Sequence, residues 1–161
     1  MKIAVFPGTF DPPTLGHLDI IERSLNVADQ LIIAVADHYK NRTPLFSVHE
    51  RLELLKKLTS KHKNIEVVSF DGLLIDCIES TRAHYIIRGL RAFSDVEYEF
   101  RMALTNRKMG DIETIFLMAG EGLAHISSSL IREIGGHGRH LLEFLPKEIE
   151  QTVFERLSNR K

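Results

Sequence analysis

The sequence has a single cysteine, Cys77, no tryptophan and only five prolines in 161 residues. One cysteine excludes an internal disulfide framework, a CxxC redox pair and a cysteine-rich zinc site. No apolar run approaches the ~20 residues that span a bilayer, and the turn at Pro7 comes too early for a secretory signal. These absences favour a cytoplasmic protein with no membrane segment.

The sequence also lacks an excess of either charge. It has 21 Lys and Arg residues against 22 Asp and Glu residues, a net charge of −1. Nucleic-acid binders usually carry a broad positive surface, so we expect no nucleic acid as a partner. Any affinity for phosphate must therefore come from local clusters. The length and the 43% hydrophobic content predict one sizeable core in a single domain over residues 1–161.

Short apolar runs alternate along the chain with segments of helical spacing. Strands are predicted at Ile3 to Phe6, Leu31 to Ala36, Ile65 to Phe70, Tyr85 to Ile87 and Thr114 to Met118. Helices are predicted from near Gly16, from Ser47 to about Lys61, over Leu73 to Thr81, over Phe93 to Lys108, from Leu130 to a stop at Gly135 and Gly136, and from Pro146. Ser47 with Glu50, and Ser94 with Glu97, fit capping boxes.

This alternation predicts the fold class and the place of a ligand. Strands separated by helices form parallel sheets with right-handed crossovers, so we expect a Rossmann-like, doubly wound, five-stranded parallel α/β sheet with helices on both faces. Ligands of such sheets bind beyond the carboxyl ends of the strands. The loops after Phe6, Ala36, Phe70, Ile87 and Met118 should therefore share one crevice.

The loop after the first strand suits phosphate. It is neither GxGxxG nor a P-loop, but Gly8 lets the backbone come close, Thr9 offers a hydroxyl and His17 would lie in the first turn of a helix. The alternative is a Pro-rich turn in which Thr14 only caps the helix and His17 lies on the surface.

Two further clusters could bind anions. Arg88 and Arg91 follow the fourth strand, where planar guanidinium groups can grip phosphate oxygens, although nearby acids could simply neutralise them. Ser127, Ser128 and Ser129 begin a helix, where hydroxyls and unpaired amides form an anion cradle or serve only as alternative caps. The histidines show no metal-ligand spacing, so we predict no metal held by protein side chains.

Together these clusters resemble the ordered signature of the bacterial phosphopantetheine adenylyltransferases. The signature consists of Gly-Thr-Phe-Asp-Pro with Thr-Leu-Gly-His17, Arg-Gly-Leu-Arg91 with Glu97-Tyr-Glu99, and Ile-Ser-Ser-Ser129 with Arg132-Glu133. The resemblance covers essentially the whole chain. It implies that ATP and 4′-phosphopantetheine give dephospho-coenzyme A and pyrophosphate, with magnesium on the triphosphate, coenzyme A as a feedback ligand and a homohexameric assembly.

The resemblance also implies roles for individual residues. His17 would act as a cation that stabilises the transition state, with Thr9 and Arg42 as the other catalytic residues. The phosphopantetheine site would comprise Thr9, Arg42, Leu74 and Arg88. The ATP site would comprise Thr9, Phe10, His17, Gly89, Leu90, Arg91, Glu99, Leu123, Ala124, His125, Ile126, Ser127, Ser128 and Ser129.

The chain departs from the family pattern at two positions. Arg42, in a loop one residue longer than usual, stands where the family has a lysine four residues before the phenylalanine equivalent to Phe46, and Lys40 lies nearby. Leu123 replaces a frequent aromatic residue, so apolar packing against adenine is expected there. The alternative functions are a sister nucleotidylyltransferase acting on nicotinate mononucleotide or glycerol 3-phosphate, and a non-catalytic sensor of adenine nucleotides.

Overall fold

The computed structural model describes residues 1–37, 43–139 and 141–159. Its elements follow in the order β1 (Ile3–Gly8), α1 (Leu15–Ser24), β2 (Gln30–Ala36), α2 (Val48–Thr59), β3 (Ile65–Phe70), α3 (Leu74–Thr81), β4 (Tyr85–Leu90), α4 (Phe93–Gly110), β5 (Glu113–Met118), α5 (Ser128–Gly136) and α6 (Lys147–Ser158). The five strands form one parallel sheet in the order β3-β2-β1-β4-β5. The predicted Rossmann-like fold class is confirmed.

Alternate side chains of the central strands pack into two hydrophobic clusters, one on each face of the sheet, because successive strand residues point to opposite faces. Ala4 and Phe6 of β1 pack with α1 and α2, and Val5 packs on the other face with α3. Helices therefore cover both faces of the sheet, as predicted. The reversal of strand order falls between β1 and β4, which is the position where doubly wound sheets bind ligands.

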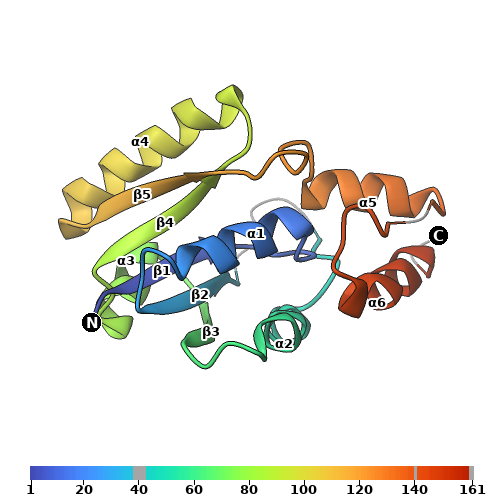
Figure 1. Cartoon of the computed structure of the whole chain (residues 1–161), viewed down its shortest axis with the longest axis horizontal. Coiled ribbons are helices and arrows are strands. Elements are labelled where there is room, and N and C mark those ends of the chain that lie inside the picture. Colours follow the sequence, from blue (N-terminus) through green and yellow to red (C-terminus); the bar gives the residue numbers. More distant parts are fainter. Residues whose placement is uncertain (38–42, 140, 160–161) are drawn as a thin grey trace.

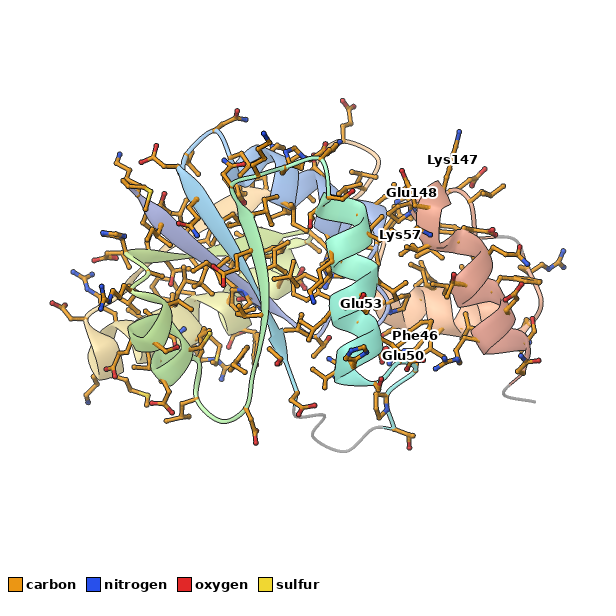
Figure 2. The ribbon with its side chains drawn as sticks, turned by 90° about the horizontal axis from the view of Figure 1, so that it is seen from below. Phe46, Glu50, Glu53, Lys57, Lys147 and Glu148 are labelled. Atoms are coloured by element: carbon orange, nitrogen blue, oxygen red, sulfur yellow. The ribbon has the colours of Figure 1, made fainter. Side chains whose placement is uncertain are left out.

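A third apolar cluster lies beside the sheet and holds the C-terminal helices. Leu54 and Leu58 of α2 pack there with Ile131 of α5 and Val153 of α6. Figure 1 shows α5 and α6 together at the end of the molecule opposite the N-terminus. In Figure 2, α2 faces α6, and the Lys57 ammonium donates a 2.6 Å hydrogen bond to the Glu148 carbonyl. This cluster ties α5, which borders the predicted phosphate site, to the rest of the fold.

Several predicted boundaries were wrong, and local hydrogen bonds explain the differences. The capping box of Ser47 and Glu50 is confirmed. The box predicted for Ser94 and Glu97 is wrong, because α4 begins at Phe93 with Ala92 as its N-cap, two residues before Ser94, and the Asp95 carboxylate accepts the Arg91 amide.

Other helix ends differ by one or two residues. Helix α5 begins at Ser128 because Ser127 caps it, and Gly135 and Gly136 are its last residues instead of a stop after it. Pro146 precedes α6 as its N-cap. Among the described helices, none is long and apolar enough to cross a membrane.

The contact between α5 and α6 generates a paired stability prediction. A Cβ at Gly135 would overlap the Leu157 side chain and lie 3.1 Å from Leu141 Cδ1, whereas one at Gly136 would meet nothing within 4 Å. Gly135→Ala should therefore lower the free energy of unfolding by about 1–3 kcal/mol through overpacking. Gly136→Ala should leave it unchanged or raise it by up to ~1 kcal/mol, since alanine favours helix. Urea unfolding of both variants measures the difference, and equal stabilities would contradict the packing described.

Candidate active site

A cleft of about 720 Å³ opens at the carboxyl ends of the strands. All five strands contribute to it, through Gly8 of β1, Ala36 of β2, Phe70 of β3, Gly89 of β4 and Ala119 directly after β5. The prediction that the carboxyl ends of the five strands share one crevice is confirmed, although no described residue of the loops after β2 and β3 is among its lining. One detail differs, since β4 continues to Leu90, so that Arg88 projects from the strand itself and not from a following loop.

Most of the predicted site residues meet in this cleft. Its lining includes Thr9, His17, Leu74, Arg88, Gly89, Arg91, Glu99, Ile126, Ser127, Ser128 and Ser129. Five others, which are Phe10, Leu90, Leu123, Ala124 and His125, are not among the lining residues. Arg42 and Lys40 lie outside the described residues.

The β1–α1 loop is built around the ring of Phe10. This side chain is fully buried, in edge-to-face contact with Phe6 and His17 at centroid distances of 5.4 and 5.0 Å. A Cβ at Gly8 would lie 2.9 Å from the same ring, so the glycine is needed to make room for it. Phe10 has a left-handed backbone, with φ of 49°, which is uncommon for a bulky residue. The predicted contact of Phe10 with nucleotide can therefore involve its backbone and not its ring.

His17 and Thr14 cap the start of α1 reciprocally. The Thr14 hydroxyl accepts the His17 amide at 3.2 Å, and Nδ1 of His17 accepts the Thr14 amide at 3.1 Å. Because a backbone amide always donates, Nδ1 must be unprotonated, which leaves the hydrogen of the neutral ring on Nε2. Thr14 therefore caps the helix, as the alternative interpretation of this loop predicted. His17, however, lines the cleft instead of lying on the surface.

Without ligands, His17 does not carry the positive charge that the resemblance implies. Removal from water, together with the positive charges of Arg91 and Arg88, lowers the pKa of His17 to about 3. A group with a lowered basic pKa is neutral above that value, so the free protein carries an uncharged imidazole at neutral pH. His17 therefore offers the cleft a neutral Nε2–H donor.

Each of the three guanidinium nitrogens of Arg88 donates a hydrogen bond to a side-chain or backbone acceptor. Its Nε and Nη2 donate to the two carboxylate oxygens of Glu99 at 2.7 and 2.5 Å, and its Nη1 donates to the Pro7 carbonyl at 2.6 Å. These bonds use three of the five N–H groups of a guanidinium and leave one on each terminal nitrogen. Glu99 is buried and uses both oxygens on Arg88, so we infer that it orients this arginine.

Arg91 joins two borders of the cleft. Its Nη1 donates to the Ile126 carbonyl, ahead of α5, at 3.2 Å, and its Nε lies 3.5 Å from Asp95 on α4. The guanidinium therefore stands between the first turn of α4 and the segment that leads into α5. The side chain remains 41% exposed, which leaves it accessible to a ligand.

The three serines before and within α5 have different positions. Ser127 caps the helix by accepting the Leu130 amide at 3.1 Å, and Ser128 donates to the Pro12 carbonyl at 2.8 Å. Ser129 is exposed. The first-turn amides of α5 border the cleft, and unpaired amides at a helix start attract anions.

The remaining predicted ATP residues have other surroundings. Leu123 packs against the apolar cluster of α2, α5 and α6, and Ala124 is exposed. The exposed His125 ring lies 6.1 Å from that of Phe144. Leu90 is buried, and its carbonyl accepts the Ala119 amide at 2.8 Å.

Sequence reasoning missed one wall of the cleft and one arginine. Tyr98, Met102 and Asn106 line it from α4, and their spacing of four residues, on the helix that carries Glu99, is a signal that could have identified them. Arg132 of α5 also lines the cleft, and its Nη1 lies 3.1 Å from Oδ2 of the buried Asp11. The sequence identifies Arg132 only as part of the family signature and predicts no role for it.

Comparisons with known proteins agree with this geometry. Residues 5–134 match the cytidylyltransferase-like family. A solved structure, that of a candidate nicotinate-nucleotide adenylyltransferase from Vibrio parahaemolyticus, superposes with a TM-score of 0.65 at 19% identity, over 95% of this chain and 99% of the other. At that identity the similarity concerns the fold alone.

Curated relatives are much closer in sequence. A phosphopantetheine adenylyltransferase of Clostridium botulinum is 50% identical over 97% of this chain and 98% of its own length. Those of Caldanaerobacter subterraneus and Lachnoclostridium phytofermentans are 48% and 41% identical, over 97% and 100% of this chain and 98% and 99% of their own lengths. With near-complete coverage at such identities, the chain belongs to the phosphopantetheine adenylyltransferase family.

Proposed function

We propose that the protein transfers the adenylyl group of ATP to 4′-phosphopantetheine, giving dephospho-coenzyme A and pyrophosphate in coenzyme A biosynthesis. The observation that carries the proposal is the cleft in which Arg88, Arg91, the start of α5 and the Nε2–H of His17 converge. A phosphate oxygen of 4′-phosphopantetheine forms a bond to the α-phosphorus of ATP, and the bond from that phosphorus to the pyrophosphate oxygen breaks. Such a reaction needs alignment and charge stabilisation, and it needs no nucleophile from the protein.

The wall formed by β4 and α4 suits 4′-phosphopantetheine. Arg88 presents an N–H on each terminal nitrogen, which matches two oxygens of the substrate phosphate. Phe70 of β3, Leu74 of α3 and Met102 of α4 also line the cleft, and their apolar side chains can pack along the pantetheine arm. Thr9 and Arg42 complete the proposed phosphate contacts, with Arg42 placed by counting back from Phe46.

The opposite wall suits ATP. Arg91, Arg132 and the amides that begin α5 face the cleft where a triphosphate would lie. The neutral His17 lies between the two walls and donates from Nε2 to an oxygen of the α-phosphate. Negative charge builds on that oxygen as the attacking group approaches, so the hydrogen bond strengthens most in the transition state.

Magnesium is proposed as an ion that the triphosphate carries. Among the described residues, no three His, Cys, Asp or Glu side chains come together, and the carboxylates of Glu99 and Asp95 already face arginines. The ion would screen the charge of the departing pyrophosphate.

Coenzyme A is proposed as a feedback ligand. It contains both an adenine nucleotide and a pantetheine arm, so it would occupy both walls at once. We further propose that the enzyme works in the cytoplasm, where its ATP is found and where the buried, free Cys77 would stay reduced.

Turnover assays separate the proposed activity from its alternatives. Pyrophosphate release from ATP should require 4′-phosphopantetheine and should not be supported by nicotinate mononucleotide or glycerol 3-phosphate. Turnover with either of those acceptors would favour a sister nucleotidylyltransferase. Binding of ATP without turnover on any of the three would favour a nucleotide sensor.

His17→Ala should lower kcat by a factor on the order of 10² or more while changing the KM values much less, because the lost donor acts mainly in the transition state. His17 does not titrate in the free protein near neutral pH, so the pH profile of kcat/KM should keep its shape in the variant. Steady-state kinetics at pH 5.5 to 9 measure both effects, with His49→Ala, at an exposed position of α2, as the control. A near-normal kcat with a greatly raised KM for ATP would make His17 a binding residue only.

A homohexamer is proposed from the exposed surface of α4. Phe93 is 93% exposed at its start, and Phe100 and Leu104 are more than half exposed further along. Exposed apolar surface of this extent is typical of protein interfaces. Light scattering at micromolar concentration should give the mass of six 18.4 kDa chains, and Phe100→Glu should lower it. Glu53→Lys, a charge change on the exposed side of α2, is the control, and a monomeric wild-type protein would overturn the proposal.

A further inference from the structure

Arg51 is a buried cation outside the cleft. It lies on α2 with a side chain that is 1% exposed, and it is not among the described residues that line the cleft. Withdrawal of a guanidinium from water is costly unless the protein replaces its hydrogen bonds. Asp37, whose side chain is half exposed, lies 4.0 Å away, too far for a hydrogen bond. Backbone carbonyls that accept hydrogen bonds from Arg51 replace part of its lost hydration.

The hydrogen bonds of Arg51 connect three separate chain segments. Its Nη1 donates to the carbonyls of Thr9 and Ala36 at 2.8 Å each, and its Nε donates to the carbonyl of Phe46 at 3.2 Å. Thr9 belongs to the β1–α1 loop, Ala36 ends β2, and Phe46 lies in the β2–α2 loop, two residues before α2 begins. Because a guanidinium is planar and rigid, it fixes the spacing of these three carbonyls, which a lysine ammonium cannot do.

Asp11 fixes the same two loops from the other side. This fully buried carboxylate accepts the Leu45 amide at 2.8 Å and the Phe46 amide at 2.9 Å. Arg156 of α6 donates to the Leu45 carbonyl at 3.0 Å, and its guanidinium lies 4.7 Å from the Phe46 ring centroid. Every backbone polar group of Leu45 and Phe46 is thus held by a side chain. We call this arrangement the Leu45–Phe46 clamp.

We propose that Arg51 is a positioning residue for the phosphate of 4′-phosphopantetheine, acting through the Leu45–Phe46 clamp and the carbonyl of Thr9. The inference rests on the proposed function, in which Thr9 contacts that phosphate from the β1–α1 loop, and Arg51 holds the carbonyl of Thr9. Arg51 itself touches neither substrate. Misplacement of a reacting phosphate by about 1 Å can cost as much as 10²-fold in rate, so a fixed spacing between these loops has a large kinetic effect.

The kinetic test compares Arg51→Lys with wild type. The lysine keeps the charge but cannot bridge the three carbonyls. We expect the KM for 4′-phosphopantetheine to rise and kcat to fall, each on the order of tenfold, while the dissociation constant for ATP, measured by calorimetry, changes less than about threefold because the α5 wall is untouched. Leu58→Ala is the control, since it removes packing from α2 in the apolar cluster that also contains Leu45 and Phe46, but Leu58 makes none of the clamp's hydrogen bonds. Equal effects of the two substitutions on 4′-phosphopantetheine kinetics would overturn the proposal.

A second measurement does not depend on the folding of any variant. In the unsubstituted, ligand-free protein, the amides of Leu45 and Phe46 should be strongly protected from hydrogen exchange because Asp11 accepts both of them. Rapid exchange in a peptide covering residues 43–48 would overturn the clamp and the proposal with it. If the wild type does not turn over 4′-phosphopantetheine, the proposed function fails while this protection still reports on the clamp, so the two failures are distinguishable.

Discussion

A guanidinium that leaves bulk water must recover its hydrogen bonds from the protein, and the arrangement of this active site follows from that requirement. Arg88 is paired with Glu99, Arg91 lies beside Asp95, and Arg132 lies beside Asp11. Each carboxylate reduces the cost of a cation near the cleft and at the same time fixes its direction. The pairs also explain how a chain with a net charge of −1 can concentrate arginines at a phosphate site.

Burial, together with these same charges, determines the protonation state of His17. Desolvation lowers the pKa of His17 most, and the charges of Arg91 and Arg88 lower it further, so a third cation in the cleft is unfavourable. The imidazole is therefore neutral and directed by its bond from the Thr14 amide. A neutral donor attracts the ground-state phosphates less than a cation would, but its hydrogen bond still strengthens as charge develops. This arrangement favours turnover over tight binding of ATP.

Sequence patterns predicted the architecture well because its causes are local. Continuous apolar runs identify strands covered on both faces, and the Ser47–Glu50 box identifies the start of α2. Local sequence patterns gave wrong predictions where a residue's position or protonation state depends on residues far away in the sequence. Arg88 does not resemble a strand residue, yet it pairs in register with Phe116 of β5. The neutral state of His17 depends on its burial by distant parts of the chain and, in addition, on arginines more than 70 positions away in the sequence.

The wall contributed by α4 was missed for a related reason. The apolar side chains of this helix are distributed over more than one face, since Met102 lines the cleft while Phe93 and Leu104 are exposed. A helix that serves two surfaces shows no single amphipathic stripe, so periodicity alone cannot assign its faces. The Leu45–Phe46 clamp was missed for a different reason. Its hydrogen bonds use backbone groups of Thr9, Ala36, Leu45 and Phe46, so the identity of these side chains does not predict the bonds.

The glycines and the aromatic ring of the first loop form one packing unit. Gly8 leaves the space that the Phe10 ring occupies, and that ring supports the imidazole of His17. At β4, Gly89 allows Ile20 of α1 to approach, since a Cβ there would lie 2.9 Å from Ile20 Cγ1. Both glycines therefore set the position of α1 relative to the sheet. Because His17 lies in the first turn of α1, the sheet fixes the direction of its Nε2–H through packing as well as through the cap at Thr14.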